Sequence, residues 1–308
     1  MENSKNMNST ENGSQVTEII GTAVKLPGVR VDRRAFLLEQ FKDAEPELRE
    51  AILKEGTIEA GVSRTELKKL ARKIVSNRTM ASSGASFVAG IPGGFAMAAT
   101  IPADTLQFYA FALRMAQEIA YLYGEKDLFE NGGLESERAT NQLLLYCGVM
   151  LGASGAAQAV RLVSASLAKQ ALKKLPQMAL TKTFYYPIVK SVAKALGARM
   201  TKGIFAKGVS KAVPLIGGVV SGGITMATMR PMGMRLVDTL DEAHFAYTQA
   251  EYDADMKTVM AECAEVEQEE KTVSPALKEI QKAKEMLDAG IITDAEFSAI
   301  KEKIISQM

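Results

Sequence analysis

Residues 102–124, PADTLQFYAFALRMAQEIAYLYG, decide the fold class of this 308-residue chain. Pro102 starts the stretch and Gly124 ends it, as is typical of the two ends of a helix. At 100° per residue the polar side chains fall within one narrow arc, and apolar side chains cover the opposite side. The stretch predicts an amphipathic helix over residues 103–123. Its polar arc consists of Asp104, Gln107, Arg114 and Glu118.

The segment just upstream, residues 79–103, carries no charge and is long enough to cross a bilayer. Gly90, Pro92, Gly93 and Gly94 interrupt it, so two short helices folded back as a hairpin are expected rather than one straight span. The same glycines superficially resemble a phosphate-binding loop. Because no strand precedes them and no lysine follows, the sequence does not favour a phosphate site.

Two further uncharged segments, residues 139–160 and 212–229, are also close to spanning length. They are rich in glycine and only moderately hydrophobic, and basic residues flank each of them. Shorter basic helices are expected between them, over residues 164–175, 187–197 and about 199–211. Basic residues beside apolar segments are typical of the cytoplasmic face of a membrane.

The N-terminal part predicts a polar disordered tail over residues 1–15, without the apolar core of a signal peptide, followed by helices with clear start signals. These signals are Asp32 before a helix over 33–44, Pro46 as the first residue of a second, and the capping box Ser63–Glu66 before a helix over 64–78.

The C-terminal part predicts a helix over residues 238–252, then an acidic linker or exposed helix within residues 253–273. Residues 274–308 predict a two-helix hairpin, whose second helix begins at the capping box Thr293–Glu296. A hairpin of this size cannot bury a core alone, so it must dock or self-associate. The ordered domain before the linker is expected to span residues 16–252.

Charge is strongly segregated along the chain, although the net charge is only +1. Residues 138–237 hold fourteen basic residues and no acidic one, whereas residues 238–308 hold 17 acids against 7 bases. A basic segment without acids is attracted to anionic surfaces. Anionic membrane lipid explains the apolar segments as well as the charge. Nucleic acid explains only the charge, and the segment lacks aromatic residues for base stacking. The candidate lipid-binding residues are Lys169, Lys173, Lys174, Lys190, Lys194, Lys202 and Lys207.

Signals for catalysis are weak. Cys147 and Cys263 have no metal-binding or disulfide spacing, the single histidine His244 is expected to be structural, and no catalytic or cofactor-binding motif occurs. Asp104 and Arg114 remain as candidate interaction residues. One interpretation is structural: the two belong to a solvated stripe, or Arg114 forms an ion pair with Glu118, four residues later. The other is that they line the junction with the upstream hairpin. An enzyme that uses the two on a lipid or peptide is a further alternative. No cofactor is expected.

Several longer runs resemble one bacterial family. AGIPGG (89–94), ATIPAD (99–104), LRMAQE (113–118), AYLYG (120–124), CGVMLG (147–152), ALTK (179–182) and SKAVPLIGGVVSGG (210–223) look like the EcsC family over residues 20–250. The resemblance implies a membrane-associated helical protein, named from an operon that encodes an ABC transporter, and offers no catalytic residues. LDAGIITDAEF (287–297) resembles the short C-terminal hairpin called SHOCT, which implies oligomerisation or docking.

The sequence therefore predicts an all-α fold: a multi-helix domain with glycine-rich apolar hairpins and a small C-terminal two-helix hairpin. The expected function is non-enzymatic attachment to the cytoplasmic face of a bacterial membrane, accessory to a transporter or to secretion, with self-association through residues 275–306. The alternative is a soluble cytoplasmic scaffold that recruits a partner through the same hairpin.

Overall fold

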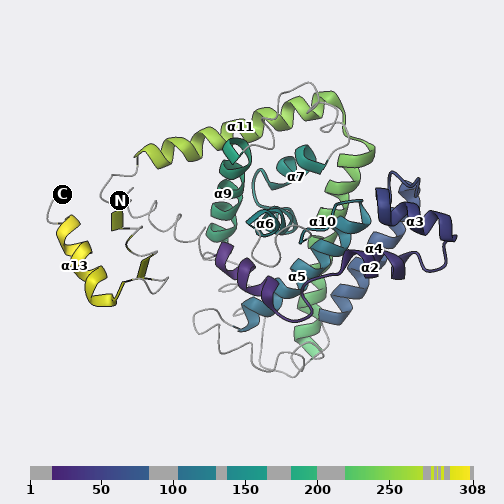
Figure 1. The fold of residues 1–308 in the computed structure, drawn as a ribbon, viewed down its shortest axis with the longest axis horizontal. Helices are drawn as coiled ribbons and strands as arrows, with labels where there is room; N and C mark the ends of the chain where they lie inside the picture. The colour runs from purple at the N-terminus through teal and green to yellow at the C-terminus, as the bar shows by residue number, and fades with distance from the viewer. Residues whose placement is uncertain are drawn as a thin grey trace. The chain divides into compact units, whose positions relative to one another are not determined.

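The computed structural model describes residues 16–82, 103–129, 137–164, 182–199 and 219–272, and in the C-terminal segment residues 279–280, 283, 286–287 and 292–305. Every regular element in these ranges is a helix, so the all-α prediction is confirmed (Figure 1). The chain divides into two compact units, unit 1 over Met1–Met260 and unit 2 over Ala261–Met308.

The N-terminal helices begin where the sequence predicts. After a helix over residues 16–25, α2 (Arg33–Gln40) starts at Asp32, whose Oδ1 accepts a 2.9 Å hydrogen bond from the backbone N–H of Ala35. Helix α3 (Pro46–Glu55) starts at Pro46. Helix α2 is four residues shorter than predicted, and the chain turns directly after it, over residues 41–43.

Helices α4 (Arg64–Ser82) and α5 (Ala103–Leu122) flank the predicted glycine-rich hairpin. Helix α4 continues four residues past its predicted end, so residues 79–82 are helical, and residues 83–102 lie outside the described part. Helix α5 ends at Leu122, one residue before the predicted end, and Gly124 follows it with a φ of +86°, at which glycine carries no steric cost.

The uncharged segment 139–160 forms two helices rather than one near-spanning segment. Helix α6 (Glu137–Leu151) and α7 (Ala156–Ser164) meet at a turn in which Gly152 and Gly155 have φ values of +67° and +70°. The left-handed backbone at these glycines reverses the chain, and most side chains of α6 are buried within the bundle.

Two prolines lie inside helices, and one of them, Pro187, was expected to begin its helix. Helix α9 (Lys182–Arg199) begins five residues before Pro187, and α10 (Val219–Phe245) continues through Pro231. The structure offers no local reason why α9 tolerates its proline. The predicted helices over 164–175 and 199–211 lie outside the described residues except for single terminal residues.

The predicted helix over residues 238–252 is interrupted, which corrects the prediction. Helix α10 ends at Phe245 and α11 (Gln249–Thr272) begins after a short break. Thr248 and Glu251 form a capping box there, with the Thr248 N–H donating to the Glu251 carboxylate at 2.8 Å and the Glu251 N–H to the Thr248 hydroxyl at 3.3 Å. The acidic residues 262–270 are part of α11, in which Ala261 and Glu265 are exposed.

Helix α10 is central in unit 1, where it packs against α4, α5, α6 and α7 (Figure 1). Arg64 binds Asp241, whereas Val75 lies against Gly233, so α4 and α10 are antiparallel. Met115 also lies against Gly233, and the Tyr123 ring stacks on His244, so α5 runs parallel to α10. The end of α4 and the starts of α5 and α10 therefore lie at the same end of the bundle, at the bottom of Figure 1.

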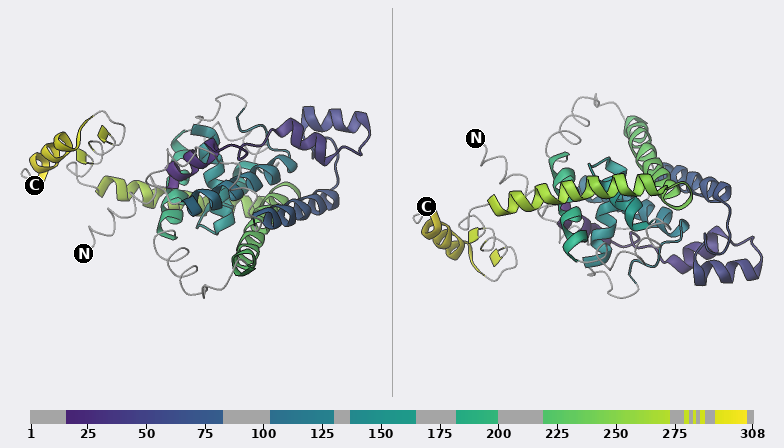
Figure 2. Two further views of the ribbon diagram at one scale, coloured as in Figure 1. Left: turned by 90° about the horizontal axis from the view of Figure 1, so that it is seen from below. Right: turned by 90° about the horizontal axis from the view of Figure 1, so that it is seen from above.

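Unit 2 contains α13 (Asp294–Ile305), drawn in yellow in Figure 2. Its predicted capping box is confirmed: the Thr293 N–H donates to the Glu296 carboxylate at 2.8 Å. Ala283 and Ile304 are the buried apolar residues among those described in this unit beyond α11.

Candidate functional site

The polar arc of α5 forms an internal ion-pair cluster. The Glu118 side chain is 2% exposed, and its Oε2 accepts a 2.6 Å hydrogen bond from Arg78 Nε, while Arg78 Nη2 binds the other oxygen. Arg114 Nε lies 3.4 Å from Glu118 Oε1, so the predicted pairing of these two residues is confirmed. Burial lowers the pKa of Arg114, as does the charge of Arg78, and Glu118 partly opposes both.

Arg114 and the neighbouring Gln117 fasten the N-terminal segment to the bundle. The Arg114 guanidinium donates to the carbonyl of Gly28. One turn on, the fully buried Gln117 amide accepts from the Val31 N–H at 2.9 Å and donates to the Val29 carbonyl at 3.0 Å. Arg114, Gln117 and Glu118 therefore form a structural clamp between α4, α5 and residues 28–31.

Of the other predicted motif residues, the structure describes the backbone of Asp104. Asp104 lies in the first turn of α5, ten residues from Arg114, which is about 15 Å along the helix axis. Gly90, Pro92, Gly93 and Gly94 lie outside the described residues.

A second cluster, which the sequence analysis missed, joins α4 to α10. Asp241 has a side chain that is 3% exposed, and it accepts bonds from Arg64 Nη2 at 2.6 Å and from Lys68 Nζ at 2.9 Å. Burial raises the pKa of Asp241, but the hydrogen bonds from the two bases outweigh burial and hold the pKa below its usual value. His244, one turn later, stacks on Tyr123 with ring centroids 6.3 Å apart, a contact in keeping with the structural role expected for it.

A third cluster connects α7 to the start of α11. Arg161 donates two hydrogen bonds to Asp255, at 2.8 and 2.9 Å, and a third to Glu242 at 3.3 Å. The Tyr247 hydroxyl donates to Asp255 at 2.7 Å. An acid from the C-terminal acidic part thus neutralises a base of the acid-free segment, so the charge segregation of the sequence is partly balanced in the fold.

The predicted lipid-binding lysines are described at two positions, both on α9. Lys190 is exposed and Lys194 is half-buried. Lys169, Lys173, Lys174, Lys202 and Lys207 lie outside the described residues.

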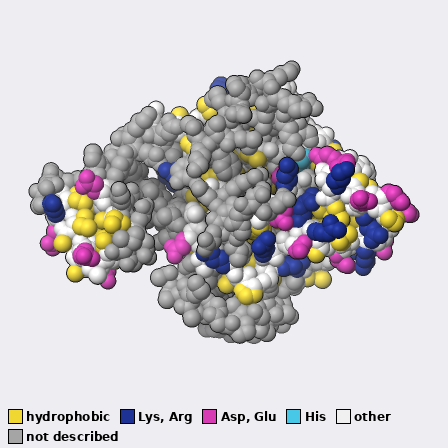
Figure 3. Space-filling model, in the orientation of Figure 1, with side chains coloured by type: hydrophobic (Ala, Val, Ile, Leu, Met, Phe, Trp, Pro, Cys, Tyr) yellow, Lys and Arg dark blue, Asp and Glu magenta, His cyan; other side chains and the backbone are white. Residues whose placement is uncertain are grey.

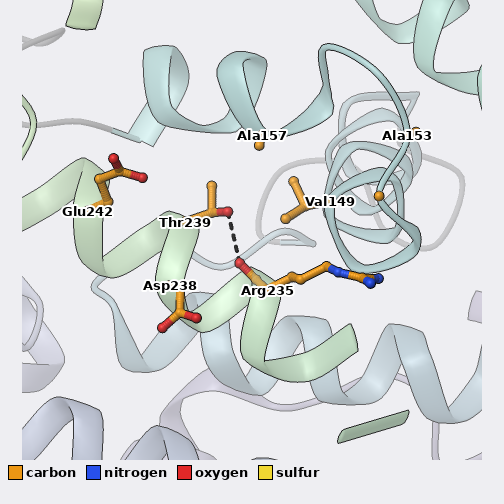
Figure 4. Close-up of a pocket in the computed structure, with 8 residues that line it drawn as sticks. Val149, Ala153, Ala157, Arg235, Asp238, Thr239 and Glu242 are labelled. Carbon is orange, nitrogen blue, oxygen red and sulfur yellow. Dashed lines mark hydrogen bonds between the residues drawn. The ribbon is translucent and has the colours of Figure 1, made fainter. Parts of the chain in front are cut away.

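An open pocket of about 320 Å³ lies where the turn between α6 and α7 meets α10 (Figure 4). Small apolar residues of α6, the turn and α7 form one wall, and Arg235, Asp238, Thr239 and Glu242 form the other. Arg235 donates to the Met150 carbonyl at 2.9 Å and Thr239 to the Arg235 carbonyl at 2.8 Å, while Glu242 binds Arg161. Three of the four polar side chains are thus engaged with protein groups, and the pocket does not present a set of convergent reactive groups.

The described residues also offer little for catalysis by thiol or metal. Cys147 is fully buried, and burial raises its pKa to about 12, so the thiol stays protonated at neutral pH. Within the described ranges, no group of three or more His, Cys, Asp or Glu side chains could hold a metal ion. None of the helices described combines the length and hydropathy that a bilayer span requires.

No curated protein and no solved structure matches the chain. The resemblance of residues 20–250 to EcsC stays a prediction. For the C-terminal segment the family comparison agrees with the sequence analysis: residues 278–305 match the SHOCT family, described as a short C-terminal domain.

Proposed function

We propose that the protein is a non-enzymatic, EcsC-like helical protein that attaches to the anionic cytoplasmic face of a bacterial membrane. Lysines of the basic segment 138–237 bind lipid head groups, and the SHOCT hairpin provides self-association or docking to a partner, such as a transporter subunit. The attachment is peripheral, or partly inserted through the uncharged segments.

One observation on the fold carries the membrane part of the proposal. The uncharged segment 79–103 begins in the last turn of α4 and ends at the first residue of α5, and the segment 212–229 includes the first part of α10, from residue 219 on. Because α4 is antiparallel to α10 and α5 parallel to it, both segments join the bundle at the same end. A bundle with two apolar glycine-rich segments at one end is suited to meet a bilayer with that end.

The charges support the choice of an anionic membrane. Each base near a cytoplasmic leaflet contributes about 1 kcal/mol of attraction. The basic segment contains fourteen bases, of which Arg161 binds acids of unit 1 and Arg235 binds a backbone carbonyl. Lys190 and Lys194 lie one turn apart on α9, with their side chains at least partly accessible.

The buried carboxylates support a role without catalysis. Glu118, Asp241 and Asp255 each bind at least one guanidinium group of the bundle. A general acid or base needs a carboxyl group that faces a substrate site, and these three hold helices together instead.

The test is fractionation of the host cell, followed by salt and alkaline carbonate washes of the membranes. We expect the protein in the membrane fraction, with salt releasing a peripheral population and carbonate resistance marking insertion. The variant Lys190→Gln/Lys194→Gln should lower the affinity for anionic vesicles roughly 30-fold, from about 1 kcal/mol per base. The control Lys54→Gln/Lys126→Gln removes two exposed lysines elsewhere and should change little.

A soluble scaffold is the second candidate, and the packing of residues 139–160 favours it. These residues form α6 and α7 inside the bundle, so one of the three uncharged segments serves as core. A cytosolic protein that binds no anionic vesicle, together with loss of self-association on removal of residues 274–308, would support the scaffold and exclude the membrane role.

A further inference from the structure

Helix α4 carries a set of basic side chains that take no part in the clusters described above. Lys69, Arg72 and Lys73 are exposed, and no hydrogen bond or ion pair links them to another described residue. At 100° per residue they span an arc of about 100° on one side of the helix. We call these three residues the basic face of α4.

The other bases of α4 are directed into the bundle. Arg64 and Lys68 bind Asp241 on α10, and Arg78 binds Glu118 on α5. The acidic residue of this helix, Glu66, lies in its first turn, at the end remote from Ser82. The helix therefore separates its bases into those that hold the fold and those that face outward without counter-charges on the same helix nearby.

An exposed apolar side chain continues the basic face toward the end of the helix. Met80 is 57% exposed, and it falls on the same arc, two turns beyond Lys73. Large apolar side chains at this exposure are rare among the described residues, where Met260 at 47% is the other example. Arg230 is also exposed, and the register of Gly233 on Val75 places it near the last turn of α4.

The space-filling view shows the charged side chains on one face of unit 1. Figure 3 shows Lys and Arg side chains gathered over the part of unit 1 that carries α2, α3 and α4, with Asp and Glu concentrated toward its outer edge.

We infer that the basic face of α4, with Met80 at its end, is a contact surface for an anionic bilayer. The inference rests on the proposed membrane attachment and adds a surface outside the basic segment 138–237. The bases meet lipid phosphates while Met80 enters the interface beyond them, at the end of the bundle where the uncharged segments begin. A charged surface that ends in an exposed apolar side chain is complementary to a layer of head groups over hydrocarbon.

The first test compares two variants that lose the same charge. Lys69→Gln/Arg72→Gln/Lys73→Gln removes the basic face of α4, and Lys54→Gln/Lys126→Gln/Lys257→Gln removes three exposed lysines dispersed over the surface. Binding of the full chain is measured with vesicles of phosphatidylcholine that contain about one third phosphatidylglycerol. From about 1 kcal/mol per base, the first variant should bind on the order of 100-fold more weakly than the wild type, and the second should bind much more strongly than the first. Equal thermal unfolding of the three proteins checks that glutamine leaves the helix intact.

The second test reports on the geometry directly. The variants Met80→Cys and Thr65→Cys are each labelled at the new thiol with an environment-sensitive fluorophore; Thr65 lies on the same side of α4, in its first turn. The native Cys147 and Cys263 are buried, so the introduced thiol reacts selectively. On addition of the same vesicles, the probe at Met80 should shift to the blue and gain intensity, and the probe at Thr65 should respond much less.

Three outcomes decide the matter. Selective loss of binding in the α4 variant, with a response of the Met80 probe, supports the surface. If the wild type binds anionic vesicles and the two charge variants bind alike, the surface is excluded while the proposed function stands, and an acidic protein or nucleic acid becomes its candidate ligand. If the wild type binds no anionic vesicle, the proposed function fails and the lipid surface fails with it.

Discussion

Replacement of Glu118 by glutamine should destabilise the bundle strongly, because it removes the one carboxylate between two guanidinium groups. The Glu118 side chain is 2% exposed, whereas those of Arg78 and Arg114 are 32% and 27% exposed. Removal of one partner from a buried ion pair costs about 3–5 kcal/mol, since the remaining charge loses its compensation. The two arginines are partly hydrated, so we expect the lower limit, a loss of about 3 kcal/mol in the free energy of unfolding.

The assay is urea-induced unfolding followed by circular dichroism, with Glu39→Gln as the matched control. Glu39 pairs with Lys42 at 3.2 Å, but the side chains are 69% and 61% exposed, so its loss should cost less than about 0.5 kcal/mol. The double variant Arg78→Gln/Glu118→Gln should be more stable than the sum of the two single changes predicts, by about 1–2 kcal/mol. Equal effects of Glu118→Gln and Glu39→Gln would refute the reasoning, because they would mean that water reaches Glu118 freely.

Three further predictions concern single residues of unit 1. The pKa of Asp241 is lower in the folded than in the unfolded state, so its contribution to stability is present above about pH 4 and is lost as pH falls through the folded pKa. In Asp241→Asn, the free energy of unfolding should therefore depend less on pH between neutral and acid pH than it does in the wild type. Gly233→Ala should lower the free energy of unfolding by about 1–3 kcal/mol, because the new methyl group would lie 2.8 Å from a methyl carbon of Val75. Gly21→Ala, whose methyl group would have no heavy atom of another part of the chain within 4 Å, should be neutral or stabilising in the same urea assay. Cys147 should resist alkylation in the native protein and react once denaturant exposes it, since its thiol is buried and its pKa is about 12. Rapid alkylation of Cys147 in the native protein, located by mass spectrometry, would contradict the burial.

The features that the sequence predicted correctly are those set by a few neighbouring residues. Asp32, Pro46 and Ser63 each mark a helix start, because the hydrogen bond or the dihedral angle that begins the helix involves the next three residues alone. The ion pair of Arg114 and Glu118 could be predicted for the same reason, since residues four apart are neighbours on a helix.

Most features that the sequence analysis missed depend on partners far away in the sequence, or are lost when charge is summed over a long segment. Asp241 and Arg64 are 177 residues apart, so nothing local in either segment indicates their contact. The break before α11 was detectable, because Thr248 and Glu251 have the spacing of a capping box. The basic face of α4 was hidden, because residues 1–137 as a whole contain slightly more acids than bases.

The long sequence separation of Arg64 and Asp241 also determines when their contact can form during synthesis. Ribosomes add roughly 5–20 residues per second, so Asp241 emerges on the order of 10–35 s after Arg64. Until then α4 has neither its counter-charge nor the glycine of α10 on which Val75 packs. The nascent chain is therefore incompletely packed for most of its synthesis, and the bundle closes only when α10, its central helix, has been made.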